Sequence, residues 1–217
     1  HERQKPMTDL IQFLPGIIAA YTILFVGASS PGPSVAMLIG IAVGQGRTPA
    51  LITTLGIAVG SVTINIITML GVGFILSQAA WAMSILRVVG AAYLLFLAFG
   101  SFKKAIVPPM LQPADSDNRT KLKHFISGYL LQVTNPKAIY FWLAISSIGA
   151  VEGAETGIVV LFIVGAFLIS FSCHGAWALA LSVSSIRKGY TAGRRWLEAA
   201  LGCFFAFAAY KLATSDN

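Results

Sequence analysis

Lys137 is a basic residue in the middle of a long apolar stretch, where few charges are tolerated. The chain has 15 Lys and Arg residues, and all the others lie in loops or near the ends of apolar segments. A charge at the centre of a bilayer costs at least about 2.5 to 3.5 kcal/mol, so Lys137 requires a partner or a water-filled cavity. Its ammonium could bind a carboxylate or exchange a proton. The alternative is that it binds backbone carbonyls and only stabilises the fold.

Amide side chains accompany this lysine in apolar segments. Asn135 comes directly before Pro136, and it could bind a ligand or the end of a neighbouring helix. A helix-capping role explains Asn135 equally well. Gln132 and, in a separate segment, Asn65 could line a polar path, although hydrogen bonds between helices account for both equally well.

A second interruption, Pro31-Gly32-Pro33, offers backbone geometry rather than side-chain chemistry. A helix that begins near Ser34 would present unpaired N–H groups and the positive end of its dipole, which suit a carboxylate. Ser29 and Ser30 add hydroxyl groups beside that of Ser34. The competing interpretation is a kink that only shapes helix packing.

His174 is an imidazole within an apolar segment, so it could carry a proton near neutral pH. A hydrogen-bonded packing role is about as common, and Lys137 is the second candidate for proton coupling. Cys173 and Cys203 have no CxxC pattern, and we expect both to be small buried apolar residues. Glu198 follows Arg194 by four residues, which predicts a local ion pair at the cytoplasmic interface. We predict no metal site and no cofactor.

The composition excludes a soluble globular protein. Of the 217 residues, 56% are hydrophobic and only 11% are charged, whereas soluble domains have about 25% charged residues. We therefore expect an all-α integral membrane protein with the lipid bilayer as its surroundings. The net charge of +7 fits Lys and Arg collected in cytoplasmic loops. We expect no nucleic-acid partner, because no basic binding module accompanies the charge.

Six apolar segments approach or exceed the length of about 20 residues that a bilayer core requires. They are Ile11–Val43, Ala50–Leu76, Ile85–Phe102, Phe125–Ala150, Thr156–Val183 and Trp196–Ala213. The first is broken at Ser30-Pro31-Gly32-Pro33 and the fourth at Asn135-Pro136-Lys137. Proline removes a helix hydrogen bond, and freed backbone groups are not left facing lipid. We therefore predict that the two breaks line a polar cavity, as in transporters built from repeats.

The basic residues predict the orientation, because Lys and Arg collect on the cytoplasmic side of membrane proteins. Ten lie in one set of alternate loops, four lie on the other side, and Lys137 is the fifteenth. Both termini are therefore predicted outside, and the loop between Phe102 and His124 inside. We interpret residues about 104–123, which contain prolines and charges, as a flexible cytoplasmic linker. The first apolar segment is too long for a signal peptide core, so we expect no cleaved leader.

Three spans on each side of this linker predict two inverted repeats in a single transmembrane domain, residues 1–217. Repeat 1 covers about 7–103 and repeat 2 about 124–213. Pro33 corresponds to Pro136, and Gly60 and Gly165 follow them by 27 and 29 residues. Gly56 and Gly60 form a small-xxx-small pattern, for which we expect packing within one protomer, with a homodimer interface as the less common use.

Three motifs, in this order, resemble the LysE/RhtB family of amino-acid exporters. They are Pro31-Gly32-Pro33 with small residues through Gly46, Leu86–Leu94, and Phe125–Ala138 followed by Tyr140, Phe141 and Trp142. The similarity extends from Met7 to Ala213. It implies secondary-active export of amino acids or related small zwitterions from the bacterial cytoplasm across the inner membrane, with protons moving in the opposite direction. The identity of the exported amino acid does not follow from the resemblance.

Two other classes of inverted-repeat membrane protein remain open. A divalent-metal exporter would need clustered carboxylates, histidines or cysteines, and no carboxylate lies in mid-span. A transmembrane thiol-disulfide carrier would need a cysteine beside each break, where this chain has Gly32 and Asn135. We expect no enzyme and no catalytic residues, because no nucleophile and base can be paired.

Overall fold

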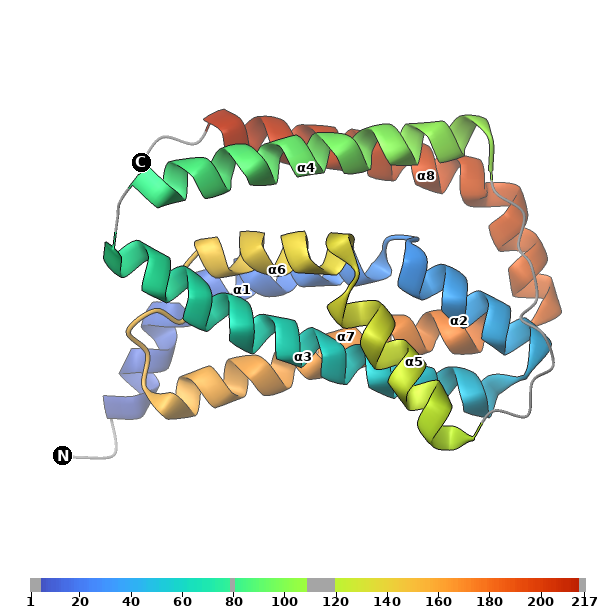
Figure 1. Ribbon diagram of the computed structural model, residues 1–217, viewed down its shortest axis with the longest axis horizontal. Coiled ribbons are helices and arrows are strands. Elements are labelled where there is room, and N and C mark those ends of the chain that lie inside the picture. Colours follow the sequence, from blue (N-terminus) through green and yellow to red (C-terminus); the bar gives the residue numbers. More distant parts are fainter. Residues whose placement is uncertain (1–4, 79–80, 109–119, 215–217) are drawn as a thin grey trace.

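The computed structural model describes residues 5–78, 81–108 and 120–214, which form eight α-helices and no strand (Figure 1). The helices are α1 (Lys5–Ser29), α2 (Pro33–Gly44), α3 (Arg47–Gln78), α4 (Trp81–Ile106), α5 (Lys121–Val133), α6 (Pro136–Ser147), α7 (Thr156–Ala180) and α8 (Ser184–Thr214). A helix satisfies its backbone hydrogen bonds within one segment, which apolar surroundings require.

Four of the described helices contain segments long and apolar enough to cross a membrane: Leu10–Ser29, Arg47–Gly71, Val88–Ile106 and Thr156–Ala180. The other two expected spans are of a different kind. Helices α5 and α6 have only 13 and 12 residues, so neither is long enough alone, and α8 carries charged residues beside its apolar part. The chain is thus a multi-pass helical membrane protein, and the six-span arrangement stays a prediction.

Both predicted breaks are present in the structure. Helix α1 ends at Ser29 and α2 begins at Pro33, while α5 ends at Val133 and α6 begins at Pro136. Each proline occupies the first turn of the helix that follows it, where its missing N–H costs no helix hydrogen bond. The interpretation of the first break as a simple kink is therefore wrong, because the helix stops and restarts.

Several helices extend beyond the apolar segments that the sequence marks. Next to the linker predicted over about 104–123, α4 continues to Ile106 and α5 begins at Lys121, and residues 109–119 lie outside the described part. Helix α8 begins at Ser184, well before the apolar segment that starts at Trp196. Its polar first turns are held by tertiary packing, because the Tyr190 ring lies 5.2 Å from the ring of Trp177.

Helices α3 and α5 cross in direct backbone contact. A Cβ atom on Gly56 would lie 2.0 Å from the Phe125 carbonyl oxygen, and one on Gly128 would lie 2.2 Å from the Thr53 carbonyl oxygen. No side chain fits at either position, so glycine is required on both helices. The small residues expected to pack within one protomer do so here.

Two further glycines receive side chains from other helices. Gly60 of α3 lies against Gln132 of α5, and Gly165 of α7 lies against the ring and hydroxyl of Tyr21 on α1. The Tyr21 hydroxyl also donates a hydrogen bond to the carbonyl oxygen of Phe162, at 3.0 Å. These contacts join α1 to α7 and α5 to α3.

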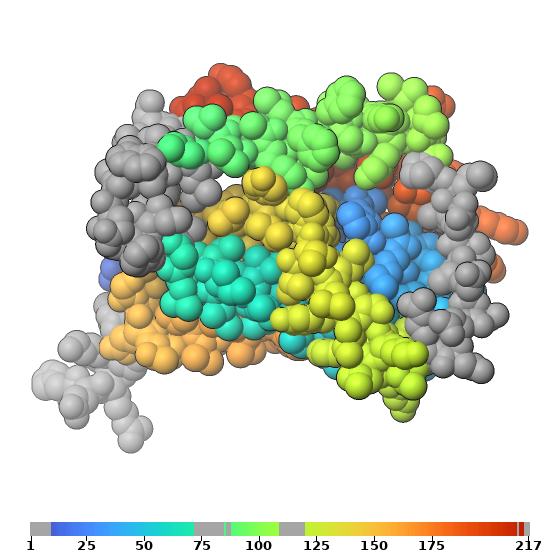
Figure 2. All heavy atoms as spheres, in the orientation of Figure 1, coloured from blue at the N-terminus to red at the C-terminus, as the bar shows by residue number. Residues whose placement is uncertain are grey.

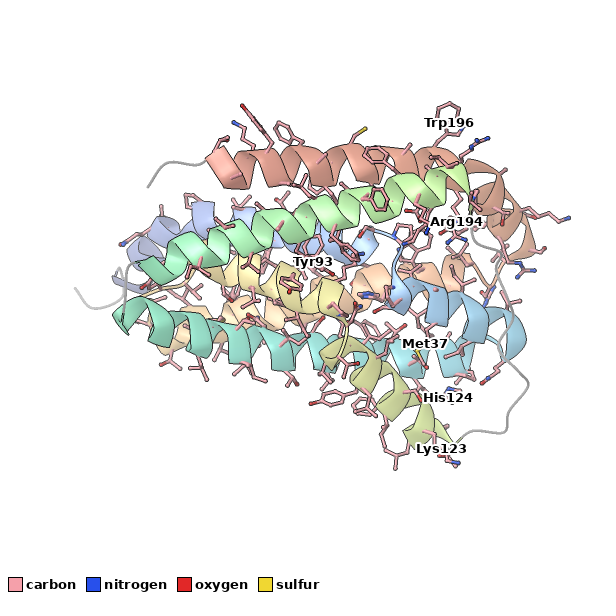
Figure 3. The ribbon with its side chains drawn as sticks, turned by 45° about the horizontal axis from the view of Figure 1, so that its top comes forward. Met37, Tyr93, Lys123, His124, Arg194 and Trp196 are labelled. Atoms are coloured by element: carbon pink, nitrogen blue, oxygen red, sulfur yellow. The ribbon has the colours of Figure 1, made fainter. Side chains whose placement is uncertain are left out.

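Helices α4 and α8 lie side by side and cover one side of the remaining bundle (Figure 1). Aromatic side chains connect the two layers. Tyr93 on α4 points toward the bundle (Figure 3) and stacks on Tyr140 of α6 with 3.8 Å between ring centroids. Phe205 on α8 meets Phe141 of α6 edge to face, at 5.9 Å.

The outer surface is largely apolar. Figure 2 shows one face, where side chains of α3, α5, α6 and α4 lie next to one another. Large apolar residues such as Ile67, Leu70 and Phe99 are more than 60% exposed. Lipid rather than water is the solvent for such a surface, since hydrocarbon-facing side chains need no burial in protein.

Candidate functional site

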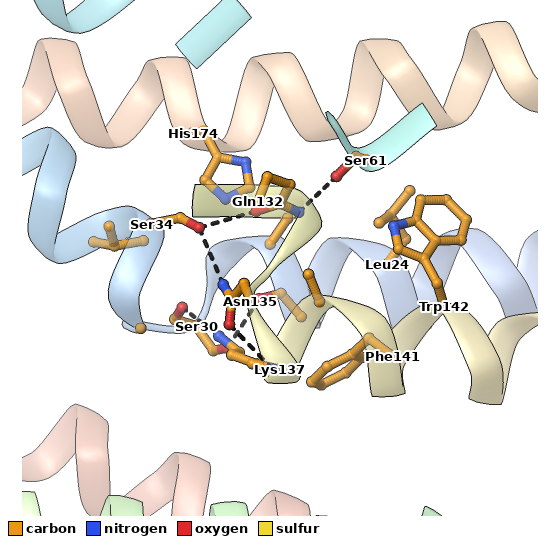
Figure 4. A pocket seen from close by; sticks show the side chains of 15 residues that line it. Leu24, Ser30, Ser34, Ser61, Gln132, Asn135, Lys137, Phe141, Trp142 and His174 are labelled. Carbon is orange, nitrogen blue, oxygen red and sulfur yellow. Dashed lines mark hydrogen bonds between the residues drawn. The ribbon is translucent and has the colours of Figure 1, made fainter. Parts of the chain in front are cut away.

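The two helix breaks meet at a small central cavity (Figure 4). Its volume is about 40 Å³. A single water molecule needs about 10–15 Å³ on this scale, so the cavity must widen before it can hold a larger solute. Its lining comes from six helices and both breaks: Leu24, Gly27, Ala28, Ser30, Gly32, Ser34, Val35, Ser61, Gln132, Asn135, Lys137, Ala138, Phe141, Trp142 and His174.

The ammonium of Lys137 reaches from the second break to the first. Its Nζ atom donates to the backbone carbonyl oxygen of Ser30 at 2.8 Å and also to the Ser30 hydroxyl (Figure 4). This carbonyl follows the C-terminal end of α1, where helix carbonyls have lost their partners and carry a partial negative charge. The nitrogen also lies 6.0 Å from the ring centroid of Phe141. The lysine therefore joins the second break to the carbonyl end of α1.

A chain of hydrogen bonds connects the second break to α3 and α7 (Figure 4). Asn135 Nδ2 donates to Ser34 Oγ at 3.3 Å, and Ser34 Oγ donates to Gln132 Oε1 at 3.0 Å. Gln132 Nε2 then donates to Ser61 Oγ at 2.8 Å, and Ser170 Oγ donates to the same oxygen at 3.2 Å. All five side chains are buried. The network fixes their orientation beside the cavity, since buried polar groups are costly without partners.

Asn135 has two roles in this arrangement. Its Oδ1 atom accepts a hydrogen bond from the backbone N–H of Lys137 at 3.1 Å and so caps α6. Its amide nitrogen points the other way, to Ser34. The capping role and the role in the cavity, which the sequence leaves as alternatives, are thus compatible in one side chain.

Gly32 makes room for the lysine. It precedes α2 with an extended backbone, φ −158° and ψ −167°, and no side chain caps that helix. A Cβ atom on Gly32 would lie 3.2 Å from both Cδ and Nζ of Lys137, so a larger residue would push the ammonium aside.

His174 faces the same cavity from α7. Its Nδ1 atom lies 2.8 Å from the backbone carbonyl oxygen of Ser170, so we assign the ring proton to Nδ1, where it donates to that oxygen. The Nε2 atom is then the acceptor. His174 and Lys137 thus line one cavity, although they are far apart in the sequence.

Comparison with known proteins identifies the family. The model of the LysE type translocator family matches residues 25–216. The chain belongs to this family. It is 28% identical to the threonine efflux protein of Escherichia coli K12, over 83% of this chain and 89% of that protein. It is 25% identical to the leucine efflux protein of Klebsiella pneumoniae, over 96% and 97% of the two chains. No solved structure matches it.

Within this translocator, the predicted site residues fall into two groups. The cavity is lined by Gly32, Ser34, Gln132, Asn135, Lys137 and His174. Pro31, Pro33, Pro136 and Asn65 do not line it. The prolines set the backbone of the breaks, with Pro33 and Pro136 exposed, and Asn65 is completely buried one turn along α3 from Ser61.

Sequence reasoning missed Ser61, Ser170 and Trp142 as parts of the site. Ser61 lies four residues before Asn65, and Ser170 four before His174, so each shares a helix face with a predicted residue. That spacing is a signal that could have found both serines. Trp142 is 1% exposed, and nothing in the sequence separates it from the neighbouring aromatic residues.

The prediction that both cysteines are buried is wrong. Cys203 is exposed on α8, and Cys173 is partly exposed, where it accepts a hydrogen bond from Ser29 Oγ at 3.6 Å. An apolar side chain in a membrane protein can face lipid instead of the interior, which explains the difference. Among the described residues, no group of His, Cys, Asp and Glu could hold a metal ion.

The ion pair expected between Arg194 and Glu198 is present, with Nε and Oε1 4.0 Å apart. The Glu198 carboxylate is nevertheless completely buried. We expected a pair at the membrane interface, where the carboxylate would be partly exposed. Figure 3 shows that Arg194 and Trp196, close together in α8, point in different directions, and Trp196 is 79% exposed. Arg195 instead donates from Nε to the carbonyl oxygen of Ala105 at 3.1 Å and joins α8 to α4.

Proposed function

We propose that this translocator exports amino acids or related small zwitterions from the bacterial cytoplasm in exchange for protons. The observation that carries the proposal is the Lys137 ammonium in a cavity between two broken helices. A zwitterion would place its carboxylate at Lys137 and at the N-terminus of α2. Its ammonium would use oxygen atoms of Ser34 or Gln132. The threonine and leucine efflux proteins among the relatives support this substrate class.

The packing of the glycines supports two inverted repeats in one domain of residues 1–217. Gly60, in the first half, packs on α5 of the second half, and Gly165, in the second half, packs on α1 of the first. Each half therefore supplies the partner for the corresponding glycine of the other. We propose six spans, repeats over about 7–103 and 124–213, both termini outside, and the inner membrane as the location.

The shared cavity supports coupling to protons. Lys137 and His174 line it together, and both can bind a proton. A solute in this small space would displace a proton held there or neutralise its positive charge. Alternate occupation by solute and proton is the property that an antiporter requires. We assign proton exchange to these two side chains.

The test is transport by purified protein in proteoliposomes loaded with labelled threonine or leucine. We expect efflux that rises with an inwardly directed proton gradient and stops when an ionophore removes that gradient. His174→Gln should weaken the response to the gradient. The exchange of labelled for unlabelled substrate at equal pH should remain in that variant. Absence of efflux for all amino acids tried would reject the proposed substrate class.

A cysteine control addresses the thiol-disulfide alternative. Replacing Cys173 and Cys203 by serine should leave the efflux rate within about twofold of wild type, because neither side chain lines the central cavity and such substitutions outside a site usually change little. Loss of activity in this double variant alone, with unchanged thermal stability, would favour the redox carrier instead.

A further inference from the structure

A second, larger cavity of about 280 Å³ lies toward the end of the molecule that is predicted to face outside. It is lined by Met69, Leu70, Ile145, Ser146, Gly149, Ala150, Val151, Glu152, Val159 and Phe162. These residues come from α3, α6, α7 and the turn between α6 and α7. The same three helices also line the central cavity.

Each of these three helices carries a row of residues spaced four apart that runs from one cavity to the other. The rows are Ser61, Asn65 and Met69 in α3; Ala138, Trp142 and Ser146 in α6; and Phe162, Ala166, Ser170 and His174 in α7. Residues four apart lie on one face of a helix. In every row one end lines the central cavity and the other end lines the outer cavity.

The space between the cavities is closed in this conformation. Asn65, Trp142 and Ala166, in the middle of the rows, are each at most 1% exposed. Toward the outer cavity, Ser146 Oγ donates a hydrogen bond to Thr68 Oγ1 at 2.9 Å and joins α6 to α3. A solute that passed between the cavities would have to separate these contacts.

Asn65 is the unusual member of the three rows. Both its amide atoms are buried, and neither has a hydrogen-bond partner among the described residues. A buried polar group without a partner costs about 1–3 kcal/mol, so packing alone gives no reason for an amide at this position. A passing polar solute would supply the missing partners.

We infer that the three rows form the exit route of the transported solute and that Asn65 is a hydrogen-bonding subsite midway along it. The inference rests on the proposed function, since it takes the solute to be a zwitterion. The amide nitrogen would donate to its carboxylate, and the amide oxygen would accept from its ammonium. Trp142 and the Thr68–Ser146 bond close the route on either side of this subsite.

Asn65→Leu tests the subsite, because leucine has the shape of asparagine without its polar atoms. We expect efflux from proteoliposomes to fall at least tenfold, while the melting temperature in detergent stays equal or rises. If Asn65 had a purely structural role, the melting temperature of Asn65→Leu would fall and its efflux would stay near the wild-type level. Ile66→Leu is the control, because Ile66 is 40% exposed on the adjacent face of α3. It should transport normally.

Labelling tests the route without relying on the folding of the leucine variant. In a background with Cys173→Ser and Cys203→Ser, Asn65→Cys should react with a small charged methanethiosulfonate reagent added outside, and faster while substrate is being exported. Ile67→Cys, which faces outward, should not show this acceleration. If the thiol introduced by Asn65→Cys stays unreactive during export, the route is overturned. A different result, wild-type protein that moves no amino acid, would reject the proposed function instead. Labelling tests the exit route and the transport assay tests the proposed function, so the two failures are distinguishable.

Discussion

The two helix breaks have the same backbone plan and different chemistry. In both, a helix stops and a proline starts the next one within a few residues. The second break caps its own helix with Asn135, whereas Gly32 provides no cap for α2. Two side chains of the second break, Lys137 and Asn135, then bind Ser30 and Ser34 of the first. The side chains of one half of the molecule thus satisfy the polar groups of the other.

Pro15 shows that a proline alone does not make such a break. It lies inside α1, which continues to Ser29. At the first break, Pro31, Gly32 and Pro33 follow one another, and at the second an asparagine caps the new helix. A break therefore requires a second feature that ends one helix or starts the next.

Removal of the charge of the second break should have the largest effect. In Lys137→Met the Ser30 carbonyl loses its cationic donor, and a charged hydrogen bond contributes about 1.5–3 kcal/mol. We expect efflux in proteoliposomes to fall about 10- to 100-fold on this basis. Lys211→Met, which removes an exposed lysine from the last turn of α8, is the control and should change little. Equal rates for the two variants would contradict a role for Lys137 in transport.

Removal of the cap of the second break should have the next largest effect. Asn135→Ala loses the cap of α6 and the bond to Ser34, so we expect about 1 kcal/mol less stability to unfolding and about 5- to 10-fold slower efflux. Thr120→Ala removes the exposed cap of α5 and should lower stability comparably while efflux stays normal. An equal loss of efflux in both variants would mean that Asn135 affects transport only through the stability of the protein.

A methyl group added at the first break should slow efflux by displacing Lys137 of the second break. Gly32→Ala places a Cβ atom 3.2 Å from Lys137 Nζ, and the lysine must move to accommodate it. We expect efflux to slow about threefold, as small displacements in a site do, with an unchanged melting temperature. Gly100→Ala, where no atom lies within 4 Å of the new methyl group, should leave efflux unaffected. A larger effect at Gly100 would show that helix flexibility, and not the position of Lys137, controls the rate.

The hydroxyl of the first break should matter least. In Ser34→Ala, Gln132 and Asn135 each lose one partner, but Gln132 keeps its bond to Ser61 and Asn135 keeps the cap of α6, so we expect only about a two- to threefold change in efflux. Ser147→Ala, which removes a local bond to the Ala144 carbonyl and lines neither cavity, is the matched control. An effect of Ser34→Ala as large as that of Lys137→Met would contradict the ranking of the two breaks.

The sequence predicts the breaks well because Pro31, Pro33 and Pro136 have strong local effects on the backbone. It also predicts most of the polar residues around the cavity, since Lys137, Asn135, Gln132 and His174 are conspicuous in apolar segments. The bond from Lys137 to Ser30 could not be predicted, because it joins residues far apart in the chain. The polar start of α8 is helical owing to contacts such as Tyr190 with Trp177, which local propensity does not contain.

The bond between Lys137 and Ser30 also bears on how tightly a substrate can be held. An ammonium that already has two oxygen partners gains less from an incoming carboxylate than a free one would, since one interaction replaces another. Weak binding limits the rate at low solute concentrations but allows rapid release on the far side. A protein built in this way would transport rapidly when its solute has accumulated and very slowly when the solute is scarce.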